Sequence, residues 1–98
     1  MDKELICAII GYGYMGKIRQ QMIDQHPNTV LSVVCETNKE KLVDEQSFKV
    51  VRDPIKVLES DVDIVFVCTP NYLIPELTIQ CLKRGKHVFS EKPPGRTL

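Results

Sequence analysis

Residues 5–16 read Leu5-Ile6-Cys7-Ala8-Ile9-Ile10-Gly11-Tyr12-Gly13-Tyr14-Met15-Gly16, an apolar run that ends in the pattern GxGxxG. Such a run predicts a β-strand. The glycines after it have separate physical roles. Gly11 permits a tight turn, Gly13 lets the backbone approach a pyrophosphate, and Gly16 lets the following helix pack closely. The stretch therefore predicts the start of a βαβ unit that binds a dinucleotide.

The helix after this loop is expected over Met15–Gln25, with Ile18, Met22 and Ile23 facing the sheet. Its first turn, near Tyr14, contains N–H groups that have no partner within the helix. These donors and the positive end of the helix dipole suit a diphosphate. The glycine loop and this helix are therefore expected to hold the pyrophosphate together.

A second apolar strand is expected at Val30–Cys35, and it ends at Glu36, which follows Gly16 by 20 residues. A carboxylate at this position accepts hydrogen bonds from the hydroxyls of an adenosine ribose. It would meet a 2′-phosphate as a like charge, so Glu36 favours NAD over NADP. Lys39 and Lys41 keep NADP possible. The alternative is that Glu36 is a solvated glutamate that begins a loop.

The rest of the chain alternates strand and helix patterns without repeats or a linker, which predicts one domain over residues 1–98. Right-handed crossovers then give an α/β fold, a Rossmann-type doubly wound parallel sheet with strand order 3-2-1-4-5. The loops at the carboxyl ends of its strands are expected to share one crevice. The remaining strands are expected at Phe48–Val51, Val62–Cys68 and His87–Ser90, and the remaining helices at 38–45, 55–58 and 73–83.

Length and charge limit the function. The chain has 98 residues with 13 basic and 13 acidic side chains, so it carries no net charge. The electrostatic attraction that drives binding to nucleic acid or to an anionic membrane is therefore missing. The mixed charges of the first four residues and the short apolar run after them fit neither a signal peptide nor a membrane span. A cytoplasmic protein with a small-molecule partner is expected.

The cysteines and histidines do not suggest a metal site. No CxxC pair occurs, and the cysteines fall on apolar strands or on an apolar helix stripe, where a free thiol behaves as a small hydrophobic group. Neither histidine has a neighbouring acid or cysteine in the sequence. We therefore expect no metal, buried thiols and structural histidines at Cys7, Cys35, Cys68, Cys81, His26 and His87.

Two further motifs follow the last two expected strands. Thr69-Pro70-Asn71 comes after the fourth strand, and Glu91-Lys92-Pro93 comes after the fifth. With the glycine loop, these motifs make the chain resemble the N-terminal part of the Gfo/Idh/MocA family of oxidoreductases, to which glucose-fructose oxidoreductase and inositol dehydrogenase belong. The resemblance spans nearly the whole chain.

The resemblance implies roles for particular residues. The backbone of Tyr12 to Met15 would contact the pyrophosphate, and the loop Thr69-Pro70-Asn71 would line the site of the nicotinamide ribose. Glu91 would help to hold that ribose, and Lys92 would be catalytic and face the reacting carbon. An ammonium there can position the hydroxyl oxygen that loses its proton. The alternative is an exposed Glu91-Lys92 ion pair on a proline-rich exit loop.

The family's second domain carries the substrate pocket, and 98 residues leave no room for it. The resemblance therefore implies the cofactor half of an enzyme that transfers hydride from a CH–OH group of a sugar, cyclitol or related polyol. We expect a chain that is truncated before the second domain and inactive alone. Its fifth strand would be a bare sheet edge, which favours self-association.

Two other function classes remain open. A regulatory module could bind a dinucleotide without catalysis. A methyltransferase that uses S-adenosylmethionine also has a glycine-rich first loop and an acid at the end of its second strand. The motifs at Thr69-Pro70-Asn71 and Glu91-Lys92-Pro93 argue against the methyltransferase.

Overall fold

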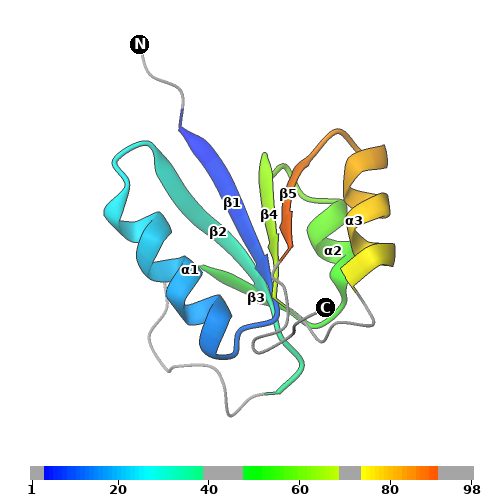
Figure 1. Cartoon of the computed structure of the whole chain (residues 1–98), viewed down its shortest axis with the longest axis horizontal. Helices are drawn as coiled ribbons and strands as arrows, with labels where there is room; N and C mark the ends of the chain where they lie inside the picture. The colour runs from blue at the N-terminus through cyan, green and yellow to red at the C-terminus, as the bar shows by residue number, and fades with distance from the viewer. Residues whose placement is uncertain (1–3, 39–47, 69–73, 91–98) are drawn as a thin grey trace, which may run out of the picture.

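The computed structural model describes residues 4–38, 48–68 and 74–90. Figure 1 shows strands and helices that alternate along these ranges. The predicted strands and most of the predicted helices are present within one or two residues of the expected bounds, whereas the helix predicted at 38–45 lies almost wholly outside the described residues. The elements are β1 (Leu5–Ile10), α1 (Tyr14–Gln25), β2 (Thr29–Cys35), β3 (Lys49–Val51), α2 (Pro54–Leu58), β4 (Ile64–Val67), α3 (Ile74–Lys83) and β5 (His87–Ser90).

The five strands form one sheet in the order β3-β2-β1-β4-β5, and every neighbouring pair is parallel. The predicted α/β fold and strand order are therefore confirmed. Because all strands run the same way, their carboxyl ends lie along a single edge of the sheet (Figure 1). In this type of fold, ligands bind at that edge.

Helices cover both faces of the sheet. Figure 1 shows α1 on one side, with α2 and α3 on the other. Strand β1 lies in the middle of the sheet and its side chains alternate between the two cores, as the pleat of a strand requires. Cys7 and Ile9 pack in the core under α1, whereas Ala8 and Ile10 pack in the core under α2 and α3. This explains why β1 is an unbroken apolar run.

One prediction about α1 was wrong. Met22 was expected to face the sheet, but its side chain is 47% exposed, whereas the adjacent Ile23 is 3% exposed. The Met22 sulfur accepts a hydrogen bond from Arg19 Nη1 on the solvent side of the helix. Neighbouring helix positions point about 100° apart, so with Ile23 packed against the sheet the Met22 side chain points toward solvent.

Asp63 forms hydrogen bonds that connect the amino ends of β1, β4 and β5. Its Oδ2 accepts a hydrogen bond from Ile6 N at 2.9 Å. Its backbone N–H donates to Ile6 O, and its backbone carbonyl accepts from His87 N. These bonds hold β1, β4 and β5 in register at the edge opposite the predicted site.

Within the described ranges, no helix is long and apolar enough to cross a membrane.

Candidate dinucleotide-binding site

The described part of the predicted site lies at the carboxyl edge of the sheet. The glycine loop from Gly11 to Gly16 leaves the end of β1, and Glu36 directly follows β2. The remaining predicted residues lie outside the described ranges, although they follow β4 and β5, whose carboxyl ends reach the same edge. These residues are Thr69, Pro70, Asn71, Glu91 and Lys92.

Two glycines of the loop are required by geometry. Gly11 has a φ of 92°, a conformation that side chains disfavour. A Cβ added to Gly16 would lie 2.3 Å from the carbonyl oxygen of Gly11 and 3.4 Å from Cγ2 of Ile9. The absence of a side chain at Gly16 is therefore what allows α1 to start so close to β1, as the sequence predicted.

The start of α1 offers free hydrogen-bond donors. Gly13 occupies the N-cap position and has no side chain to accept a hydrogen bond. Lys17 N donates to Gly13 O at 3.0 Å, so the N–H groups of Tyr14, Met15 and Gly16 precede the first helical bond. The first turn contains no acidic side chain. An anionic group at this position would meet backbone donors and the positive end of the helix dipole.

Glu36 is buried, with 8% of its surface exposed. Its Oε1 accepts a hydrogen bond from Tyr12 N at 2.7 Å, and its Oε2 accepts one from Asn38 N at 2.9 Å. Its own N–H donates to Val51 O at 3.0 Å. The alternative of a solvated glutamate is therefore wrong. A carboxylate has about four acceptor positions, so Glu36 keeps capacity for ribose hydroxyls beside these two bonds.

Nothing local in the sequence indicated that the Tyr12 side chain is buried, and only its backbone was expected to contact the pyrophosphate. The Tyr12 ring packs edge-to-face on Phe48, with centroids 5.5 Å apart. The Lys17 ammonium lies 5.6 Å from the ring centroid, and the Tyr12 hydroxyl donates to Gln20 Oε1. Burial, followed by the negative charge of Asp24, raises the pKa of the phenol. Tyr12 thereby anchors the glycine loop to α1 and to the segment that leads into β3.

The thiols agree with the expectation of a structural role. Cys7, Cys35 and Cys81 are buried, Cys68 is partly buried, and none of the four forms a disulfide. Burial is the main cause that raises the pKa of the Cys7, Cys35 and Cys81 thiols. Among the described residues, no group of histidine, cysteine and carboxylate side chains could hold a metal ion.

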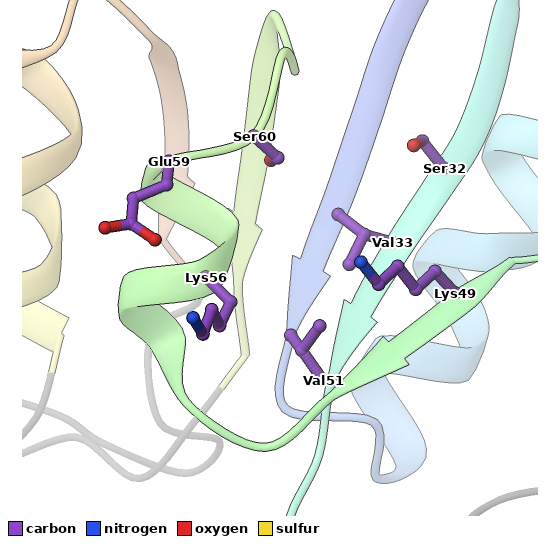
Figure 2. A pocket seen from close by; sticks show the side chains of 7 residues that line it. All are labelled: Ser32, Val33, Lys49, Val51, Lys56, Glu59 and Ser60. Atoms are coloured by element: carbon purple, nitrogen blue, oxygen red, sulfur yellow. The ribbon is translucent and has the colours of Figure 1, made fainter.

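A cavity of about 290 Å³ lies elsewhere, between α2 and strands β2 and β3. Figure 2 shows its lining side chains around the gap between the short helix and the sheet. Ser32 lies at a register shift between β1 and β2, so it and Val33 both line the cavity. No predicted site residue contributes to it. The lining residues are Ser32, Val33, Lys49, Val51, Lys56, Glu59 and Ser60.

The chain is similar in sequence to proteins named as oxidoreductases, dehydrogenases or hydratases. The model of the oxidoreductase family with an NAD-binding Rossmann fold, GFO_IDH_MocA, matches residues 5–98. Myo-inositol 2-dehydrogenase from Thermotoga maritima is 34% identical over 99 residues, which is 93% of this chain and 29% of that protein. The 2,7-anhydro-N-acetylneuraminate hydratase from Mediterraneibacter gnavus is 36% identical over 89 residues, which is 88% of this chain and 24% of that protein.

The solved structures of two enzymes contain a domain with the same fold as this chain. Apo scyllo-inositol dehydrogenase from Lactobacillus casei has a TM-score of 0.85 and 29% identity, and the match covers 97% of this chain and 30% of that one. The WlbA dehydrogenase from Chromobacterium violaceum, solved with NADH and UDP-GlcNAcA, has a TM-score of 0.85 and 28% identity. That match covers 95% of this chain and 28% of the enzyme.

The chain belongs to the Gfo/Idh/MocA oxidoreductase family and is its NAD-binding Rossmann domain. It spans less than a third of the length of the curated relatives described above. The described groups suit the cofactor, because backbone donors lie where a diphosphate would bind and a buried carboxylate lies where a ribose would bind. Family membership thus favours an oxidoreductase over the methyltransferase alternative.

Proposed function

We propose that this chain is the cofactor-binding part of an enzyme that oxidises a CH–OH group of a sugar, cyclitol or related polyol. The observation that carries the proposal is the hydrogen bond between Tyr12 N and the buried Glu36, which joins the glycine loop to the expected ribose site. Two relatives with inositol dehydrogenase names support the substrate class. NAD would accept the hydride when it is bound.

We assign the cofactor contacts from where the residues lie along the chain. Residues 11–16 would hold the pyrophosphate, and Glu36 would bind the adenosine ribose and disfavour a 2′-phosphate by charge. Residues 69–71 and Glu91 would hold the nicotinamide side. Lys92 would orient the substrate hydroxyl and help to move its proton. These contacts lie in a single domain, residues 1–98, which would bind NAD but leave polyols unoxidised by itself.

A chimera tests the catalytic part of this proposal. Residues 5–98 would replace the matched segment of the Thermotoga maritima myo-inositol 2-dehydrogenase, and NADH formation from myo-inositol would be followed by absorbance. We expect turnover, with a loss in kcat of about 100-fold or more for Lys92→Ala. Lys83→Ala, at an exposed lysine of α3, is the matched control and should leave kcat unchanged. A folded, NAD-binding chimera whose kcat is unaffected by Lys92→Ala would refute the assigned role.

A second candidate function follows from the relative named as a hydratase, which is 36% identical. Adding water to a substrate is redox-neutral overall, so a protein with that activity would consume the substrate without net formation of NADH. Measuring both substrate loss and NADH in the same assay separates the two candidates. Equal amounts of NADH and product support the dehydrogenase.

A further inference from the structure

Glu36 forms part of the framework of the glycine loop. Both of its carboxylate oxygens accept backbone N–H groups, one from Tyr12 and one from Asn38. The Tyr12 bond is 2.7 Å long and buried, and its partners are 24 residues apart in the sequence. A charged acceptor makes such a hydrogen bond stronger than one between neutral groups. The acid expected to bind the ribose therefore also binds the loop expected to bind the pyrophosphate.

Tyr12 is fixed at two points. Its amide is held by Glu36, and its ring is held in the core under α1 by Phe48. The residue before it, Gly11, is fixed as well, because Gly11 N donates to Cys35 O at 2.8 Å. Two consecutive amides of the loop thus bond to two consecutive residues at the end of β2. Without the Glu36 carboxylate, the buried Tyr12 N–H would lose its acceptor, and an unsatisfied buried donor is costly.

We propose that Glu36 is a positioning residue for the glycine loop, so that it strengthens binding of the pyrophosphate as well as of the ribose. This inference rests on the proposed function for its ligand, but the contact itself exists without one. A loop held in its binding shape before the ligand arrives loses less conformational entropy on binding. The effect of Glu36 should therefore extend to ligands that lack ribose hydroxyls.

The first test needs no ligand. Amide hydrogen exchange would be measured by NMR in the wild-type chain, Glu36→Ala, Glu36→Gln and the control Glu59→Ala, which changes an exposed glutamate beside α2. We expect Glu36→Ala to reduce protection of the Tyr12 amide by about tenfold. The Gly11 amide, bonded to Cys35 O, should keep its protection. Unchanged protection of Tyr12 would overturn the inference.

Glu36→Gln serves as a variant of similar size that retains one carbonyl acceptor. It should keep the Tyr12 amide protected and lose protection at Asn38, because its amide nitrogen cannot accept a hydrogen bond. Like Glu36→Ala, it removes the negative charge of the carboxylate. A comparison of the two variants therefore separates the hydrogen bond to the loop from electrostatic repulsion of an anionic ligand.

The second test uses ADP and 2′,3′-dideoxy-ADP, which share the pyrophosphate and differ in the ribose hydroxyls. We expect Glu36→Ala to bind the dideoxy nucleotide about fivefold more weakly than Glu36→Gln does, the size of one net hydrogen bond. Equal affinities would mean that Glu36 acts through the ribose alone and would overturn the inference. Failure of the wild-type chain to bind ADP would instead count against the proposed function, and hydrogen exchange would still decide the role of Glu36.

Discussion

Gly16, the last glycine of the GxGxxG motif, allows α1 to pack closely against the glycine loop. Because an added Cβ would lie 2.3 Å from the backbone oxygen of Gly11, Gly16→Ala must push α1 away from the loop. We expect a loss of about 1–3 kcal/mol in the free energy of unfolding, the usual cost of overpacking, measured by urea denaturation.

Gln21→Ala is the control for Gly16→Ala. Gln21 is exposed on the same helix, so its replacement should change the free energy of unfolding by less than about 0.5 kcal/mol. Similar effects of the two substitutions would mean that the contact between Gly16 and Gly11 does not limit how closely α1 packs.

Cys35 makes the stability depend on pH in the alkaline range. Burial, then the charges of Glu36 and Asp53, raises the pKa of its thiol from 9.0 to about 11. Between these values the unfolded chain releases a proton that the folded chain retains, so the free energy of unfolding should fall as the pH rises from 9 to 11. Urea denaturation across this range should show a shallower fall for Cys35→Ala. If the free energy of unfolding fell equally steeply with pH in the variant and the wild type, the raised pKa of the Cys35 thiol would be contradicted.

Among the strands, Asp63 fixes the register of the second half of the sheet. Asp63→Ala would leave the partly buried Ile6 N–H without its acceptor, at a cost of about 1–3 kcal/mol in the free energy of unfolding. Thermal and urea denaturation would measure this loss. Asp61→Ala, at an exposed acid two residues earlier, should have an effect below about 0.5 kcal/mol. The prediction fails if the two variants are equally stable.

The order and bounds of the strands could be predicted because their apolar runs and the loop residues between them are local features. The glycine loop and Glu36 could be predicted for a similar reason, because the βαβ unit fixes the number of residues between them. Other features depend on contacts between distant residues. The burial of Tyr12 requires Phe48, and the exposure of Met22 depends on how α1 meets the sheet. No local pattern indicated the register shift at Ser32.

In the molecule as a whole, β5 forms one edge of the sheet and carries an exposed aromatic side chain. Phe89 is 58% exposed and stacks on Phe66, with ring centroids 5.3 Å apart. We propose that two copies associate through this edge, because edge strands readily pair. Sedimentation velocity at increasing concentration should detect a dimer, and Phe89→Glu should weaken it.

Leu82→Glu is the matched control for the dimer. Leu82 is 60% exposed on α3, so the substitution adds the same charge to another apolar surface position. It should leave the association intact. A wild-type chain that stays monomeric at all concentrations, or equal effects of the two substitutions, would contradict association through β5.

We propose that the glycine loop and Glu36 together form the NAD site of this chain. The most direct measurement is a calorimetric titration of the wild-type chain with NAD and, separately, with NADP, repeated on Glu36→Ala. We predict saturable binding of NAD, at least about tenfold weaker binding of NADP because of the like charge, and loss of this preference in the variant. Absence of binding by either dinucleotide, or tighter binding of NADP by the wild-type chain, would contradict the account.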